Sequence, residues 1–320
     1  MKKIKLKDNF IFLVVILLSI VIYIVNPIFF SVGNLLDILR AISVPGILAI
    51  GAFLIIISGG VDLSFGAIAT AAMVISGKYM EQLKGNVFNT FLIGAAIGLC
   101  FGAINGLLVG KLKIPTIIAT LGTFSIFRSA LVLFVPNSTG YGLTEAFISF
   151  SKINLYGVPV QVFFFIGISI LTWAILKYTL IGRGVYAIGG NLESSSRIGL
   201  NIFGIQMFIY CYAGLLAGLA GVLNTSITQL YSARSFMGAE FPVITAVILG
   251  GASIVGGKGS VLATIFGSLF VIIVNNGLIL MKVNPYWYNI FLGFLILISI
   301  SIDANQKRII AERVIKVNID

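Results

Sequence analysis

Residues 87–110 read VFNTFLIGAAIGLCFGAINGLLVG, a run without a single charged side chain. As a helix it would rise about 36 Å, which is enough to cross the hydrocarbon core of a bilayer. Similar runs lie on both sides of it, at about 10–30, 41–58, 61–77, 114–135, 159–181, 203–224, 241–256, 259–281 and 286–302. The sequence therefore predicts an all-α membrane protein with about ten transmembrane helices.

Composition supports this class and argues against others. The 320 residues are 59% hydrophobic and only 10% charged, whereas soluble domains are about 25% charged. There is no His, and Cys100 and Cys211 lie inside apolar runs, so we expect no metal site and no disulfide framework. The net charge of +11 is scattered over loops and tails. We therefore expect neither nucleic acid as a partner nor catalytic residues in this chain.

The expected topology follows from the basic residues. Lys and Arg are most frequent in the segments that would be cytoplasmic if both chain ends lie there. We expect a basic N-terminus at 1–9, a transmembrane domain at 10–302 with its longest cytoplasmic loop at about 182–202, and a cytoplasmic tail at 303–320. The first helix is expected to be retained in the cell membrane, because it lacks a small-residue cleavage site. The gaps between spans fall below the ~50 residues of an independent domain, so any ATP-binding domain is expected on another chain.

The run at 87–110 also carries a glycine at every fourth position, which places these glycines on one helix face. They are Gly94, Gly98, Gly102, Gly106 and Gly110. In lipid, small residues let a second helix backbone approach closely. We interpret this ridge as a helix-packing seam, with a direct role in lining a substrate path as the alternative. Gly214 and Gly218 repeat the spacing in another run.

Two glycine-rich turns flank the two short runs, 61–77 and 241–256. They read SGGVDLSFG at 58–66 and LGGASIVGG at 249–257. Such interruptions indicate either backbone that lines a cavity or simply tilted helices. A phosphate-binding loop is excluded at the second turn, because Ala252 and Gly259 occupy positions where that motif needs Gly and Ser or Thr.

Several polar residues lie within or at the ends of the spans. Asp62 either caps a helix or contacts substrate or a gate. Neutral side chains could form a path for a polyhydroxylated solute or hydrogen bonds between helices; with Asp62, the path candidates are Ser64, Asn105, Thr120, Thr123, Asn275 and Asn276. Glu240, beside Pro242, is expected to cap a helix or, with Arg234, to contact a docking protein at the outer surface.

The central cytoplasmic loop contains GGNLESSSRIG at 189–199. Glu193 and Arg197 have the i,i+4 spacing of a helical ion pair, Asn191 can cap that helix and Gly199 can end it. A short surface helix of this kind suits docking against a cytoplasmic partner.

In order along the chain, these motifs resemble those of the ribose-type permease subunits of bacterial ABC importers. The resemblance covers about residues 40–303 and is carried by GGVDLS at 59–64, IPT at 114–116 with TLGT at 120–123, the central loop, and Glu240 followed by AVILGG at 246–251 and GGKG at 256–259. It implies a type II importer fold in which two permease copies surround a central path. It also implies two cytoplasmic ATP-binding subunits, which carry ATP and Mg, and an extracytoplasmic solute-binding protein; this chain itself would bind no cofactor.

The same resemblance implies that about 189–200 couples the permease to the ATPase. The coupling residues would be Gly189, Gly190, Asn191, Glu193, Ser194, Ser195, Arg197 and Gly199. The sequence departs from the family at Ser194 and Ser195, where small alanines are usual, and at Pro242, where an aspartate is usual.

The GGVDLS turn favours a monosaccharide as the solute. Autoinducer-2, a nucleoside or a branched-chain amino acid remain alternatives within the importer class. A secondary carrier that works without an ATPase would show several acids at mid-membrane depth, and this sequence offers essentially Asp62 there.

Overall fold

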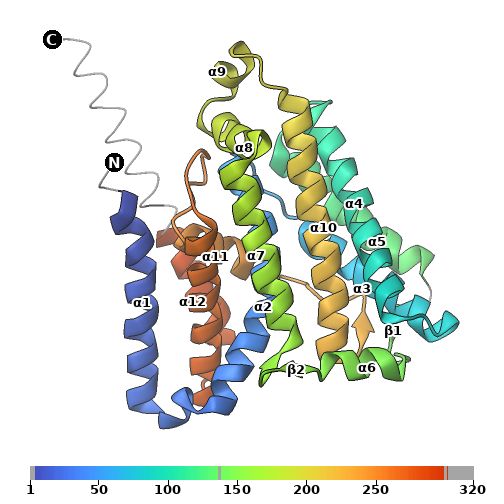
Figure 1. The fold of residues 1–320 in the computed structure, drawn as a ribbon, viewed down its shortest axis with the longest axis vertical. Helices are drawn as coiled ribbons and strands as arrows, with labels where there is room; N and C mark the ends of the chain where they lie inside the picture. Colours follow the sequence, from blue (N-terminus) through green and yellow to red (C-terminus); the bar gives the residue numbers. More distant parts are fainter. Residues whose placement is uncertain (1–3, 136–137, 299–300, 302–320) are drawn as a thin grey trace.

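The computed structural model describes residues 4–135, 138–298 and 301, and within them the chain is mostly helical. The long helices run side by side along one direction (Figure 1). Their bounds are α1 (Ile4–Val25), α2 (Val32–Ile57), α3 (Phe65–Leu83), α4 (Val87–Gly110), α5 (Thr116–Phe134), α7 (Val160–Tyr178), α10 (Ile202–Thr228) and α12 (Val261–Leu280). The predicted cytoplasmic tail, 303–320, lies outside the described residues, as do residues 1–3 of the basic N-terminus.

Over the described residues, six helices are long and apolar enough to cross a membrane: α2, α4, α5, α7, α10 and α12. Shorter apolar helices cover Ile11–Val25, Glu240–Leu249 and Tyr286–Ile298. The prediction of a helical membrane protein with several spans is confirmed at this level, while the count of ten spans stays a prediction.

The helix limits of the two short runs bounded by glycines differ from the expectation. The run expected at 61–77 becomes α3, which begins only at Phe65 because residues 58–64 are not helical. The run expected at 241–256 contains α11 (Glu240–Leu249). As a helix of 10 residues, α11 rises about 15 Å, half of what a bilayer core requires.

The glycine ridge of α4 lies against α10. A Cβ added at Gly98 would overlap the Gly214 carbonyl oxygen and lie 3.0 Å from the Gly218 Cα. A Cβ at Gly102 would overlap the Tyr210 carbonyl oxygen. Helix backbones come this close only where side chains are missing, so the ridge forms the packing seam between α4 and α10.

The two ends of the bundle are built differently (Figure 1). At one end lie α8 (Leu180–Gly190) and α9 (Leu192–Arg197). The other end carries the connections η1 (Pro27–Phe30), α6 (Glu145–Ser151), β1 (Thr139–Gly140), β2 (Asn154–Leu155), β3 (Val158–Pro159) and β4 (Tyr231–Ser232). The strands form two antiparallel pairs, β1 with β4 and β2 with β3.

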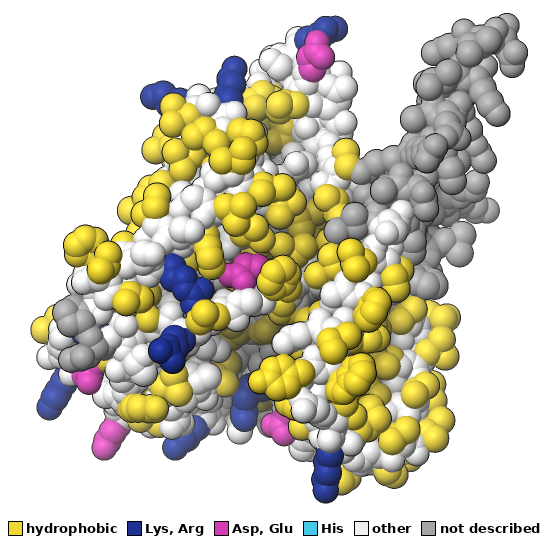
Figure 2. Space-filling model, turned by 180° about the vertical axis from the view of Figure 1, so that it is seen from behind, with side chains coloured by type: hydrophobic (Ala, Val, Ile, Leu, Met, Phe, Trp, Pro, Cys, Tyr) yellow, Lys and Arg dark blue, Asp and Glu magenta, His cyan; other side chains and the backbone are white. Residues whose placement is uncertain are grey.

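The main hydrophobic core surrounds the C-terminal half of α2, where nearly every residue from 42 to 57 is buried. The surface between the ends is apolar instead of polar. Figure 2 shows hydrophobic side chains over most of one face, with Lys and Arg gathered mainly toward its two ends. Because lipid replaces water around a membrane protein, an apolar belt with charged ends is the expected surface.

Candidate functional site

Side chains of α5 form hydrogen bonds with the backbone of the connection between α2 and α3. The α2 helix ends at Ile57, and Gly59 has a φ of 89°, in the left-handed region that favours glycine. The backbone N–H of Val61 donates to the Thr116 hydroxyl (3.2 Å), and that of Leu63 donates to the Thr120 hydroxyl (3.3 Å). These bonds satisfy backbone groups that the interrupted helix leaves without partners.

Asp62 and Ser64 sit at the start of α3 in a buried polar cluster. One Asp62 carboxylate oxygen accepts from the Ser64 backbone N–H (2.5 Å) and from the Ser64 hydroxyl (2.7 Å). Asn105 of α4 is fully buried and donates from its amide nitrogen to the Ser64 hydroxyl (2.7 Å). Asp62 therefore bonds to Ser64, the residue directly before α3, and not to a backbone N–H within the helix. Its contact with substrate or a gate stays a prediction.

Two buried polar side-chain atoms beside this cluster have no hydrogen-bond partner within the described part of the protein. They are the Asn105 side-chain carbonyl oxygen and the hydroxyl of Tyr210. The Tyr210 hydroxyl lies beside Gly60, 3.4 Å from where a Cβ would be. Tyr210 was not predicted from the sequence. The helix contains two phenols, Tyr210 and Tyr212, and a phenol in a helix does not by itself distinguish a site residue from a packing residue.

The structure brings some of the predicted path residues together and separates others. Thr120 contacts the 58–64 segment, and the buried Thr123 hydroxyl donates to the Thr120 carbonyl oxygen one turn earlier on α5 (3.3 Å). In contrast, Asn276 pairs with Asn34 of α2 (2.7 Å), and Asn275 lines a different cavity, of about 260 Å³. The two asparagines of α12 therefore do not belong to the cluster around Asp62.

A larger cavity of about 900 Å³ joins the 58–64 segment to the predicted coupling loop. Ser58, Gly59 and Gly60 line one part of it, and the start of α10 lines another. From the coupling loop come Ile188, Gly189, Gly190, Asn191, Leu192, Glu193 and Ser196. Sequence reasoning treated these two segments separately, and the tertiary structure places them around one space.

Three glycine pairs, at 59–60, 189–190 and 256–257, come together beside this cavity. We call the contact between Gly59, Gly189, Gly256 and Gly257 the glycine junction. The Gly257 N–H donates to the Ile57 carbonyl oxygen (2.7 Å). A Cβ at Gly189 would overlap that same oxygen and lie 2.6 Å from the Gly257 nitrogen, and a Cβ at Gly256 would lie 2.8 Å from the Gly59 nitrogen. Backbone therefore packs directly on backbone, and α8 is fixed to the ends of both glycine-rich turns.

The short helix α9 has the expected caps and ion pair. Asn191 accepts from the Ser194 N–H (2.8 Å), Glu193 and Arg197 pair at 2.6 Å, and Gly199 leaves the helix with a φ of 81°. The Ser195 side chain faces inward and is 4% exposed. The outward side presents Leu192 and Ile198, which are 51% and 75% exposed. A helix with exposed apolar side chains at one end of the bundle is suited to binding another protein.

The two predicted docking residues have different surroundings. Arg234 is exposed, just after β4. Glu240 is 6% exposed and packs toward α3, where a Cβ at Gly66 would lie 2.5 Å from a carboxylate oxygen. That oxygen has no hydrogen-bond partner. The structure therefore turns Glu240 into the helix bundle, and only Arg234 is accessible to a protein from outside.

Comparison with known proteins gives a family. The model of the branched-chain amino acid transport system permease component matches residues 34–300. The chain is 34% identical to the ribose import permease protein of Haemophilus influenzae, with 91% of each chain covered, and 35% identical to that of Bacillus subtilis, with 92% of each covered. It is 31% identical to the D-allose transport system permease protein of Escherichia coli, with 86% of this chain and 84% of the relative covered. No solved structure matches significantly. The chain belongs to the family of branched-chain amino acid transport system permease components.

Proposed function

We propose that this chain is the membrane permease subunit of an ATP-driven ABC importer that carries a monosaccharide, ribose or a similar sugar, into the cytoplasm. The observation that carries this proposal is the 34–35% identity to two ribose import permeases over 91–92% of the chain. The buried polar cluster around Asp62 adds chemical support, because hydroxyls and amides can bind a neutral polyhydroxylated solute. The chain performs no covalent chemistry, and ATP is hydrolysed by a separate subunit.

The finer architecture is part of the same proposal. Ten segments cross the membrane in a type II importer fold, one of them formed by the short α11 and the non-helical residues after it, and both chain ends lie in the cytoplasm. Two permease copies surround the path, two ATP-binding subunits bind below, and a solute-binding protein docks above. The distribution of Lys and Arg supports this orientation, which puts α8 and α9 on the cytoplasmic side.

Coupling runs from α9 to the polar cluster. When the ATP-binding subunits move α9, α8 moves with it, and the glycine junction passes the displacement to residues 58–64. These residues contact α5 through Thr116 and Thr120 and α4 through Asn105. A displacement of one segment can therefore change the access to the cluster.

Reconstituted transport tests the proposed function. Vesicles that contain the permease, its ATP-binding subunits and its solute-binding protein should accumulate labelled ribose or a related monosaccharide only when ATP is supplied. The permease alone should accumulate nothing against a gradient, because it has no energy source. Uphill uptake by the permease alone, or uptake of amino acids but no sugar by the full assembly, would contradict the proposal.

Cysteine cross-linking tests the position of the coupling segment. We expect Ser194→Cys and Ser196→Cys, whose side chains are exposed, to form disulfide cross-links with cysteines in the groove of the ATP-binding subunit. The matched control is Ser195→Cys, because Ser195 lies between them and its hydroxyl donates inward to the Asn191 carbonyl oxygen (2.8 Å). Non-reducing gels of the assembled complex give the readout. Equal cross-linking at all three positions, or none, would remove the coupling assignment from α9.

A further inference from the structure

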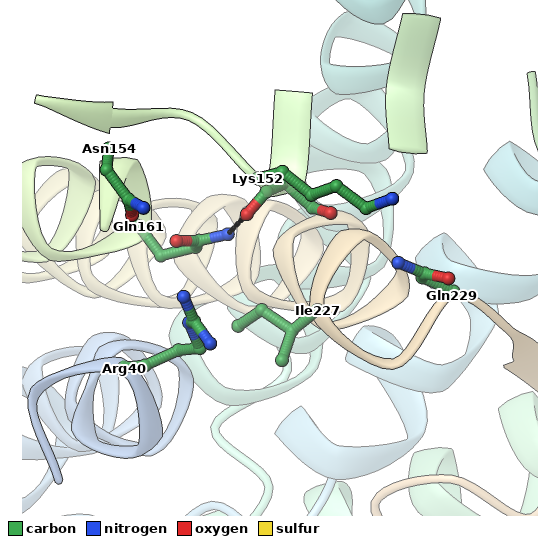
Figure 3. Close-up of a pocket in the computed structure, with 7 residues that line it drawn as sticks. Arg40, Lys152, Asn154, Gln161, Ile227 and Gln229 are labelled. Atoms are coloured by element: carbon green, nitrogen blue, oxygen red, sulfur yellow. Dashed lines mark hydrogen bonds between the residues drawn. The ribbon is translucent and has the colours of Figure 1, made fainter. Parts of the chain in front are cut away.

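A cavity of about 290 Å³ lies at the end of the bundle opposite α9, between α2, the start of α7 and the end of α10. Its polar lining is shown in Figure 3. It consists of Arg40, Ser151, Lys152, Asn154, Gln161 and Gln229, with Ile227 as its apolar member. The described residues that line it include two cationic side chains and no Asp or Glu.

Two buried polar atoms at this cavity have no partner in the protein. The Nε of Arg40 is buried and donates to nothing. Gln161 is fully buried, and although its amide nitrogen donates to the Ser151 carbonyl oxygen (2.8 Å), its side-chain oxygen accepts nothing. Arg40 points from α2 toward Gln161 (Figure 3). Leaving a buried charged donor and a buried acceptor unsatisfied is costly, so a ligand that satisfies both would be stabilised here.

The unpaired atoms specify the ligand chemistry. The buried Arg40 Nε is best satisfied by an oxyanion, because guanidinium groups suit such acceptors. The Lys152 side chain is exposed and extends away from Arg40 (Figure 3), so it adds positive charge at the rim of the cavity. The Gln161 oxygen requires a donor, and an ionised Asp or Glu from a docking protein has none to offer. An anionic phosphodiester whose headgroup also carries a hydroxyl satisfies both requirements.

The surroundings indicate a lipid as the source of that phosphate. Asn154 lies in the β2–β3 hairpin, where Ile153 and Leu155 are each 43% exposed and Tyr156 at the tip is fully exposed. Exposed apolar and aromatic side chains beside a basic pocket are typical of the headgroup layer of a membrane. We propose that this cavity binds the phosphate of an anionic, hydroxyl-bearing lipid headgroup, such as that of phosphatidylglycerol, at the extracytoplasmic end of the permease.

Native mass spectrometry of the purified full-length chain tests the proposal. Phosphatidylglycerol should bind roughly tenfold more tightly than phosphatidylcholine, whose headgroup has no hydroxyl and no net charge. Arg40→Gln and Lys152→Gln should each weaken phosphatidylglycerol binding by roughly that factor. The control, Arg234→Gln, removes the same charge from an exposed side chain at the same end and should leave binding unchanged. Lys152 is also exposed, so its variant is expected to fold even if the Arg40 variant does not.

Thermal unfolding with inorganic phosphate distinguishes the two sources of the ligand. If millimolar phosphate alone raises the unfolding temperature of the wild type but not of Lys152→Gln, the cavity binds an oxyanion, and its ligand is free phosphate and not a lipid. If lipid binding is the same in all three variants and phosphate has no effect, the proposal is overturned. It is also overturned if Arg40→Gln weakens only the binding of the solute-binding protein, because the cavity would then receive a protein carboxylate.

Discussion

Replacing Gly189 by alanine is expected to reduce ATP-driven uptake by roughly tenfold or more, while Gly190→Ala keeps most of it. The added methyl group at Gly189 would overlap the Ile57 carbonyl oxygen and approach the Gly257 nitrogen to 2.6 Å. Both obstacles are backbone atoms, so no side-chain rotation can relieve the contact. The segments must separate, at a cost of about 1–3 kcal/mol, and the hydrogen bond from Gly257 to Ile57 is disturbed. At Gly190 the same methyl group meets no atom within 4 Å.

The measurement is sugar uptake and ATP hydrolysis by the same reconstituted assembly. If the glycine junction transmits motion, Gly189→Ala should hydrolyse ATP without corresponding uptake, and its unfolding temperature should stay close enough to the wild type to show that it is folded. The neighbouring Gly190→Ala controls for helix propensity, since both variants gain the same methyl group. Equal uptake by the two variants would remove the junction from the coupling pathway.

The second large effect is expected at the seam between α4 and α10. Gly102→Leu should prevent normal packing, because its Cβ would overlap the Tyr210 carbonyl oxygen and lie 3.1 Å from the Cys211 Cα. Overpacking of this kind costs several kcal/mol, and we expect an unfolding temperature lower on the order of 10 °C, together with a low yield of folded protein. Thermal unfolding in detergent and the monodisperse fraction on size-exclusion chromatography provide the measurements.

Gly167→Leu is the matched control for this seam. Gly167 also lies inside a membrane helix, α7, and a Cβ there meets nothing within 4 Å. It should therefore tolerate leucine with little change in stability, since the new side chain enters lipid. If both leucine variants are equally unstable, the loss reflects glycine replacement in general, and the ridge on α4 has no special role.

Some local features of the candidate site could be predicted from the sequence. The spacing of Glu193 and Arg197, with Asn191 before them and Gly199 after them, predicted α9 with its cap, ion pair and end. These features depend on residues within one or two helical turns, so the sequence contains them in full. The sequence could not predict that the Ser195 side chain points inward, because its burial depends on which elements α9 packs against.

Long-range contacts account for most of what the sequence could not predict. The glycine pairs near residues 59 and 256 were visible as turns and the pair at 189 as part of the central loop, but their meeting at one junction depends on how three separate connections pack. The same applies to Glu240: the sequence offered a helix start or an outer docking surface, and the structure has it in the first turn of α11 with its carboxylate toward Gly66. It also applies to Tyr210, because the contact of its hydroxyl with Gly60 joins α10 to the connection between α2 and α3.

The sequence by itself determined that this chain is a bundle of apolar helices with a glycine ridge on α4 and a short capped helix in its central loop, because hydrophobicity, helical period and capping are local properties. Only the tertiary structure decided which backbone the ridge contacts, where the helix is interrupted around Asp62, and which polar atoms at Arg40 and Gln161 remain unpaired. These features arise where segments distant in sequence exclude or satisfy one another in space, and no single segment contains that information.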